Sequence, residues 1–169
     1  YHLTGEIAID RTSAGNLGGL FDMEKNDWSD EMLAVLGIPR SMLPQRILDP
    51  TDILGRLNEE SARELKLLPG TPVCAGCIDC LASTLSSGVY SAGHTVAVLA
   101  TSLNWGLVHG QKQENQQYIS MPYLTKDHSL RYTYGGISTA GALTKWFANN
   151  LVQNPFAADQ EQKEQKLLF

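Results

Sequence analysis

The residues best suited to chemistry lie in the segment 72–88, which reads PVCAGCIDCLASTLSSG. Its one carboxylate, Asp79, stands between an apolar run that predicts a buried strand over 71–78 and small residues that predict a helix. At the carboxyl end of a strand, where open α/β sheets bind ligands, an aspartate can accept the proton of a hydroxyl that attacks a phosphoryl group. Considered alone, Asp79 is explained more simply as a helix cap.

A second candidate site lies in the segment 95–104, TVAVLATSLN. Its β-branched residues predict a strand that runs into a turn at Thr101 and Ser102. Backbone N–H groups and hydroxyls in such a turn can bind nucleotide phosphates. On its own, however, an ordinary hairpin turn explains the segment better.

The cysteines Cys74, Cys77 and Cys80 suggest a different chemistry, because C-x2-C-x2-C begins the ligand run of an iron–sulfur cluster. The sequence has three cysteines and therefore lacks the fourth ligand of such a cluster. Zinc would need a histidine, and His94 is fourteen residues beyond Cys80. Cysteines in an apolar strand and helix start often serve as small buried residues. We therefore expect no metal site and keep a metal or redox module as an alternative.

Local patterns predict the elements that would carry these residues. Ser29 and Asn58 are N-cap residues before helices, and Gly37 ends the first of these. The predicted helices cover residues 30–36, 59–67, 80–87 and 138–151. Further strands are predicted over 95–100, 104–108, 118–123 and 130–134. Residues 1–28 are expected to form strands and loops, and 38–57 an extended connection.

The apolar residues Ala140, Leu143, Phe147 and Leu151 share one face of the last predicted helix. Trp28 and Trp146 lie among apolar neighbours, and we expect both to anchor the core. The charged residues in 159–166 predict an exposed helix face.

The order of these elements indicates an α/β protein with two parts. A helix-rich first half changes to a hairpin-rich second half near Gly93, so we predict domains over 1–93 and 94–169. The chain starts at Tyr1 without methionine and ends in a polar stretch that favours a helix. Both features lead us to expect an internal piece of a longer protein.

The composition excludes several function classes. Of the 169 residues, 43% are hydrophobic and 18% charged, with a net charge of −5, which argues against nucleic acid or an anionic membrane as partner. No apolar run approaches the roughly 18–20 residues that span a bilayer. There is no basic-then-apolar signal segment at the start. We therefore expect a cytoplasmic protein.

A series of short motifs occurs in a fixed order along the chain. They are Thr4-Gly5-Glu6-Ile7-Ala8-Ile9-Asp10, Ser13-Ala14, the trio Asp22, Trp28 and Leu33, Gly37-Ile38-Pro39, Leu43-Pro44, Gly55, the run 70–73, the run 76–88, the turn 100–103, and Gly135, Gly136, Gly141 and Trp146. Each motif is weak singly. Their order and spacing, up to about Leu151, resemble those of the FGGY family of carbohydrate kinases.

The resemblance implies an actin-like ATPase (ribonuclease H-like) fold, covering the end of a sugar-binding domain and the start of a nucleotide-binding domain. It implies that Asp79 is the general base, and that Asp79 and Cys80 contact the substrate. It assigns nucleotide contacts to Thr101, Ser102, Gly135 and Gly136. The cofactors would be ATP and Mg²⁺, and the substrate a sugar, sugar acid or polyol. A homodimer is compatible with this assignment.

The chain also departs from the family pattern. Ala100 and Leu103 replace glycines of the phosphate loop, and Cys80 replaces a residue that is polar in several members. The family's D-x-G-T/S phosphate loop does not occur in this sequence. We therefore expect the chain alone to be inactive, and we keep a catalytically silent relative that binds sugar or nucleotide as an alternative. Ketopentose and hexonate kinases are equally compatible with the sequence.

Overall fold

The computed structural model describes residues 1–110 and 117–151. The charged stretch 159–166, predicted as a helix face, lies outside these residues. The described chain forms two compact units. The first contains Tyr1–Val96 and Gly106–Tyr134, and the second contains Ala97–Trp105 and the described residues from Gly135 onward. The domain boundary near Gly93 stays a prediction.

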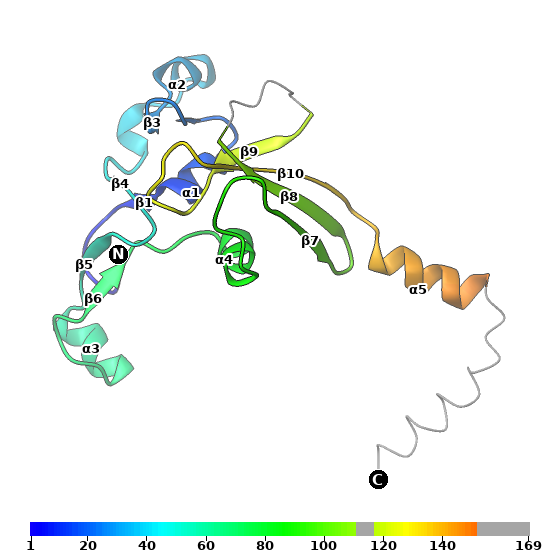
Figure 1. The fold of residues 1–169 in the computed structure, drawn as a ribbon. Coiled ribbons are helices and arrows are strands. Elements are labelled where there is room, and N and C mark those ends of the chain that lie inside the picture. The colour runs from blue at the N-terminus through cyan, green and yellow to red at the C-terminus, as the bar shows by residue number, and fades with distance from the viewer. Residues whose placement is uncertain (111–116, 152–169) are drawn as a thin grey trace, which may run out of the picture. The chain divides into compact units, whose positions relative to one another are not determined.

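The described residues form both helices and strands, with a run of four strands before the last helix (Figure 1). The α-helices are α1 (Arg11–Gly15), α2 (Asp30–Leu36), α3 (Glu59–Leu65), α4 (Asp79–Ser86) and α5 (Gly141–Asn150), with a 3-10 turn at Arg40–Met42. The strands are β1 (Ile9–Asp10), β2 (Phe21–Asp22), β3 (Asp27–Trp28), β4 (Ile47–Leu48), β5 (Ile53–Arg56), β6 (Pro72–Cys74), β7 (Thr95–Leu99), β8 (Leu103–His109), β9 (Ile119–Pro122) and β10 (Arg131–Ile137).

The described strands form one four-stranded sheet and three two-stranded sheets. The larger sheet has the order β7-β8-β10-β9 (Figure 1). Strand β9 pairs with β10 antiparallel, so that Tyr132 lies opposite Met121. The small sheets pair β1 with β4 in parallel, and β2 with β3 and β5 with β6 in antiparallel fashion.

The predicted caps of α2 and α3 are confirmed. The hydroxyl of Ser29 accepts the N–H of Met32, and Gly37 ends α2 in the left-handed conformation with a φ of 65°. The side chain of Asn58 accepts the N–H of Ser61 at the start of α3. Side chains of the N-cap type satisfy N–H groups that the helix itself leaves unpaired, so these ends are fixed locally.

Three expectations about the elements are wrong. The strand predicted over 71–78 is only β6, with two of its three residues exposed, because Pro72 has no N–H and Gly76 adopts a φ of 80° that ends extended pairing. The first 28 residues contain the helix α1, with Asp10 as its N-cap. The last helix starts at Gly141, because Gly135 and Gly136 continue strand β10.

Two apolar clusters lie in the first unit. One packs α4 against the sheet through Leu81, Val108, Met121, Tyr123 and Tyr132, with Val89, Leu124 and Leu130. The other gathers Ala14, Phe21, Trp28 and Leu33.

The predicted core role of Trp28 is confirmed, since 1% of it is exposed. That of Trp146 is wrong, because 54% of it is exposed and α5 buries none of its residues. Within the described ranges, no helix combines the length and the apolar character that crossing a membrane requires.

Candidate functional site

Asp79 is the first residue of α4 and its side chain is exposed. The N-cap of this helix is Ile78, which contributes no side-chain hydrogen bond, so the interpretation of Asp79 as the cap is wrong. One carboxylate oxygen of Asp79 accepts the N–H of Cys80 at 2.7 Å. This places a carboxylate at the start of a helix with much of its surface open to solvent.

Helix α4, which carries that carboxylate, is anchored by buried side chains. Leu81 and Thr84 are fully buried, and the hydroxyl of Thr84 donates to the carbonyl of Cys80 at 2.7 Å. The ring of Tyr132, 2% exposed, packs in the same apolar cluster as Leu81. The buried side of α4 therefore fixes the direction in which its first residue points.

The residue before Asp79 is tied to α1. The N–H of Ile78 donates to the hydroxyl of Thr12 at 3.1 Å, and that hydroxyl donates to the carboxylate of Asp10. Asp10 also accepts the N–H groups of Thr12 and Ser13, at 2.9 and 3.0 Å. The sequence interpretation missed these residues as part of the site. An aspartate followed by small polar residues is an N-cap signal, but nothing local indicates that its helix reaches the segment before Asp79.

Two of the three cysteines near Asp79 pack against the core. Cys77 and Cys80 are partly buried against the cluster that contains Tyr123 and Tyr132, whereas Cys74 is exposed. Burial, and then the nearby carboxylate of Asp79, raises the pKa of the Cys80 thiol. Burial, and then Asp10, raises the pKa of Cys77. The substrate contact expected of Cys80 stays a prediction.

Both thiols are therefore protonated at neutral pH, which is the form that binds metals poorly. No three His, Cys, Asp or Glu side chains gather as a metal site in residues 1–110 and 117–151, a range that includes all three cysteines.

Thr101 and Ser102 occupy the turn between β7 and β8, and both are exposed. The carbonyl of Thr101 accepts the N–H groups of Ala140 and Ala142, at 2.8 and 3.3 Å, and the carbonyl of Ala100 accepts that of Gly141 at 3.0 Å. The turn thus uses its carbonyl groups to hold the start of α5. Nucleotide binding by the hydroxyls of Thr101 and Ser102 stays a prediction.

Gly136 and Gly141 are required by this arrangement. A Cβ on Gly136 would lie 2.7 Å from the carbonyl oxygen of Leu103, and one on Gly141 would lie 2.3 Å from that of Ala100. Packing against the turn therefore explains both glycines. The nucleotide contacts predicted for Gly135 and Gly136 stay predictions.

The substitutions in the turn do not strain its backbone. Among the described residues other than glycine, only Asn26 and Lys66 have a positive φ, so Ala100 and Leu103 adopt conformations open to any L-residue.

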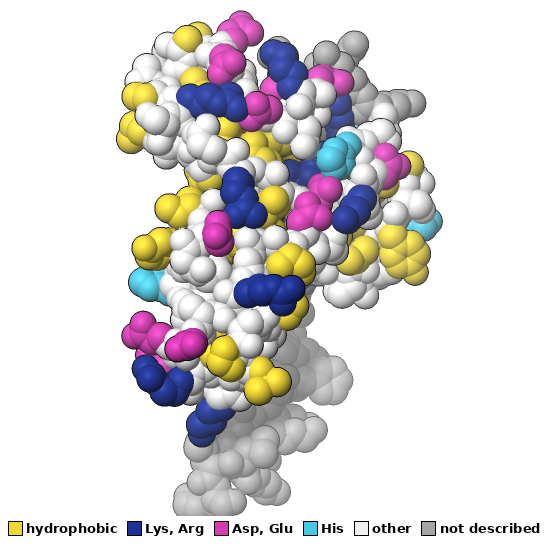
Figure 2. All heavy atoms as spheres, turned by 90° about the vertical axis from the view of Figure 1, so that its left-hand side faces the viewer, with side chains coloured by type: hydrophobic (Ala, Val, Ile, Leu, Met, Phe, Trp, Pro, Cys, Tyr) yellow, Lys and Arg dark blue, Asp and Glu magenta, His cyan; other side chains and the backbone are white. Residues whose placement is uncertain are grey.

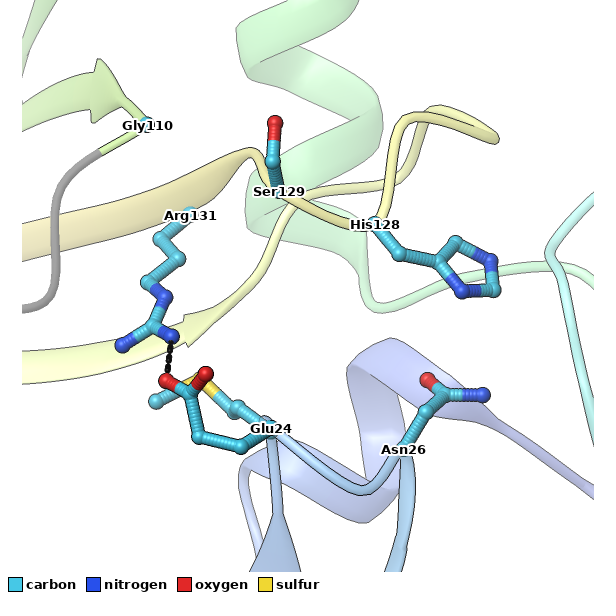
Figure 3. Close-up of a pocket in the computed structure, with 7 residues that line it drawn as sticks. Glu24, Asn26, Gly110, His128, Ser129 and Arg131 are labelled. Atoms are coloured by element: carbon cyan, nitrogen blue, oxygen red, sulfur yellow. Dashed lines mark hydrogen bonds and ion pairs between the residues drawn. The ribbon is translucent and has the colours of Figure 1, made fainter.

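A pocket of about 300 Å³ lies elsewhere in the first unit, between the turn that joins β2 to β3 and the connection from β9 to β10 (Figure 3). Arg131 forms an ion pair with Glu24, and His128 contacts the carboxylate of Asp49 at 2.9 Å. Each basic side chain thus already faces a carboxylate, which disfavours phosphate binding here. The pocket contains none of the predicted site residues. Its lining is Met23, Glu24, Asn26, Gly110, His128, Ser129 and Arg131.

Charges of both signs are interspersed on the face of the molecule drawn in Figure 2. A basic stripe of the kind that binds nucleic acid is not present on that face.

The comparisons with known proteins agree with the landmarks in the sequence. The N-terminal domain of the FGGY family of carbohydrate kinases matches residues 1–86. An autoinducer-2 kinase of Klebsiella pneumoniae is 32% identical over 128 residues, which are 76% of this chain and 21% of that protein. The chain thus spans about a fifth of the length of that curated relative.

Solved structures of sugar kinases share the fold. The xylulose kinase of Rhodospirillum rubrum matches with a TM-score of 0.81 at 24% identity, over 95% of this chain and 32% of that one. The gluconate kinase of Lactobacillus acidophilus matches with a TM-score of 0.80 at 22% identity, over 91% of this chain and 31% of that one. The chain has the α/β, actin-like ATPase fold of these enzymes over the part that it spans. Since the family match covers residues 1–86 of 169, this chain belongs to the FGGY family of carbohydrate kinases.

Proposed function

We propose that this chain is part of an enzyme that transfers the γ-phosphoryl group of ATP to a hydroxyl of a sugar, sugar acid or polyol. The observation that carries the proposal is the exposed carboxylate of Asp79 at the first residue of helix α4, which the buried side chains of Leu81 and Thr84 anchor in the core. The carboxylate of Asp79 is held in position by the helix and is accessible from solvent. The relatives named above are kinases of such small molecules.

In the proposed reaction, Asp79 accepts the proton of the substrate hydroxyl as its oxygen attacks the γ-phosphorus of ATP, and ADP leaves. A general base of this kind supplies roughly 10²–10⁴-fold of the rate. Cys80, the next residue, would contact the substrate beside it. Burial raises the pKa of the Cys77 and Cys80 thiols, so both are neutral neighbours of Asp79.

Thr101 and Ser102 would contact the phosphates of ATP through their exposed hydroxyls, and Gly135 and Gly136 would allow the nucleotide close to the backbone. Mg²⁺ would arrive bound to those phosphates and offset their charge. The part of the chain that the structure describes gathers no set of three acidic, histidine or cysteine ligands for it. The cation would therefore depend on the nucleotide and on other parts of the enzyme.

The chain spans about a fifth of its curated relative, so we expect activity from a longer polypeptide that contains it and none from the chain alone. The setting we propose is the cytoplasm, where ATP and small sugars meet. The homodimer stays a prediction, and light scattering on the purified protein would measure the mass.

The test measures ADP release by the longer polypeptide with Mg-ATP and a panel of ketoses, polyols and sugar acids. We expect one compound to stimulate release, and Asp79→Asn to reduce that stimulation by roughly 10²–10⁴-fold. Asp30→Asn, which changes an exposed aspartate at the start of α2, is the matched control and should retain activity.

A specific observation keeps a second candidate in view, since Ala100 and Leu103 replace the glycines of the family's phosphate loop. A folded protein that binds ATP but shows no stimulation by any compound would contradict the proposed activity. It would identify a catalytically silent relative instead.

A further inference from the structure

Two buried polar side chains link helix α1 to the segment that carries Asp79. Thr12 is fully buried and Asp10 is 8% exposed. The hydroxyl of Thr12 accepts the N–H of Ile78 at 3.1 Å and donates to Asp10. Asp10 and Thr12 lie more than sixty positions before Ile78, and the hydrogen bond spans 66 residues of sequence.

The chemistry of the hydroxyl makes this link directional. A threonine hydroxyl has one proton and two lone pairs. Because the proton is directed at the Asp10 carboxylate, the lone pairs remain to accept the N–H of Ile78. Asp10 is itself oriented by the N–H groups of Thr12 and Ser13. The carboxylate therefore sets the direction in which Thr12 can accept.

Helix α1 is a firm support for such a link. A Cβ on Gly15 would lie 2.2 Å from the Cδ of Pro122, so α1 and β9 approach closely. Arg11, 1% exposed, forms an ion pair with Asp49 at 3.7 Å, just after β4. The support on which Thr12 sits is thus packed on two sides.

Ile78 is the N-cap residue of α4, with extended backbone angles of −66° and 147°. Its N–H lies outside the helix and finds its acceptor in Thr12. The backbone torsions of Ile78 decide where the following carboxylate points. If that N–H lost its acceptor, the turn into α4 could relax, and a displacement of about 1 Å can cost roughly 10²-fold in rate.

We propose that Thr12, oriented by Asp10, is a positioning residue that holds the carboxylate of Asp79 in place for proton transfer. The proposal rests on the proposed function, because it assigns Thr12 a part in the same reaction. Thr12 touches neither substrate nor nucleotide in this scheme and acts through the backbone of Ile78.

The experiment compares Thr12→Val with Thr12→Ser in the longer polypeptide, at saturating ATP and the stimulating sugar. Valine has the shape of threonine but no acceptor, so we expect kcat to fall about 10- to 100-fold. Serine keeps the hydroxyl and should retain most of the activity. Calorimetry should give the same ATP affinity for both variants. The number of ATP sites per molecule in the same measurement reports the folded fraction of each protein.

A second arm repeats Thr12→Val in the Asp79→Asn background. It separates a role of Thr12 in positioning Asp79 from a general effect on the stability of the protein. If Thr12 acts through Asp79, adding Thr12→Val to Asp79→Asn should leave the residual kcat nearly unchanged, because the two effects are not additive. A full 10- to 100-fold further loss in that background would overturn the proposal, as would wild-type kcat for Thr12→Val alone.

Failure of the proposed function has different outcomes, namely no stimulation of the unmodified protein by any compound, or full activity of Asp79→Asn with the sugar. Should Thr12→Val not fold, Thr12→Cys replaces it, since it matches serine in shape but offers a weak sulfur acceptor. Equal kcat values for Thr12→Cys and Thr12→Ser would then overturn the positioning role.

Discussion

At the scale of single residues, the exposed carboxylate of Asp79 contrasts with the partly buried thiols that flank it. Asp79 follows a cap residue and projects from the first turn of α4, whereas Cys77 and Cys80 pack against the tyrosine cluster. Burial disfavours the thiolate, and a nearby carboxylate disfavours it further. The same local arrangement therefore leaves an exposed carboxylate beside two thiols that stay protonated at neutral pH.

This contrast predicts the order in which the cysteines react with iodoacetamide. Cys74 is exposed and should be alkylated first at pH 7.5 in the folded protein. The raised pKa values of Cys77 and Cys80 mean less thiolate at any given pH, so their labelling should speed up as pH rises. Mass spectrometry of the peptides measures each rate. Equal rates in the folded protein would contradict the prediction, and urea should abolish the differences.

How far single residues could be predicted depends on where their partners lie. Asp79 stands within a recognisable run, and so it was a candidate from the sequence. The link from Thr12 to Ile78 joins residues 66 positions apart and has no local signature. The exposure of Trp146 also depends on what covers α5, so apolar neighbours in sequence were a poor guide.

At the scale of elements, local signals and tertiary contacts contribute differently. The starts of α2 and α3 were predictable because Ser29 and Asn58 bond to N–H groups three residues on. The length of β6 was not, because a strand extends only as far as its partner pairs, and the pairing with β5 has an irregularity between Ile53 and Gly55. The helix α1 has only five residues, too few for a clear apolar period.

Strand β8 contains a glycine whose role is set by its neighbour β10. A Cβ on Gly106 would lie 2.0 Å from the hydroxyl oxygen and 2.1 Å from Cζ of Tyr132. That ring is buried and stacks against Tyr123 and Tyr134, with centroids 6.5 and 5.7 Å away. The ring therefore has little room to move aside.

We predict that Gly106→Ala lowers the free energy of unfolding by about 1–3 kcal/mol, the usual cost of overpacking a core. Gly110→Ala is the matched control, because it follows the same strand, has no left-handed φ and would place its Cβ in open space. Urea unfolding of both variants measures the difference. A Gly106→Ala protein as stable as the control would show that the ring of Tyr132 moves aside at little cost in free energy.

At the scale of the whole molecule, several carboxylates are ionised more readily in the folded chain than in an unfolded one. The pKa of Asp27 is lowered mainly by its hydrogen bond with Arg40, at 2.6 and 2.7 Å. Backbone N–H groups lower that of Asp22, and the hydroxyl and N–H of Ser129 lower that of Asp127. Asp22 and Asp27 lie opposite each other in the β2–β3 hairpin, and Asp127 lies in the connection from β9 to β10, so the effect on stability comes from two segments.

The consequence is a loss of stability in acid. A carboxyl group whose folded pKa lies below its unfolded value of about 3.9 contributes stability above that value and loses it as pH falls through the folded pKa. We therefore expect the urea midpoint to be steady above about pH 5 and to fall progressively below about pH 4. Each partly exposed ion pair contributes little by itself, since solvent screens it.

Variants of Asp27 and Arg40 measure how much of this acid sensitivity comes from their interaction. Asp27→Asn removes the titrating group and Arg40→Gln removes the partner, so each should make the midpoint fall less steeply between pH 5 and pH 3, a window set by the lowered pKa of Asp27. The double variant should match the single ones, because both changes act on one interaction. An unchanged slope in Asp27→Asn would show that the acid sensitivity arises at the other carboxylates. A midpoint that fell still less steeply in the double variant than in Asp27→Asn would show that Arg40 acts on a group other than Asp27.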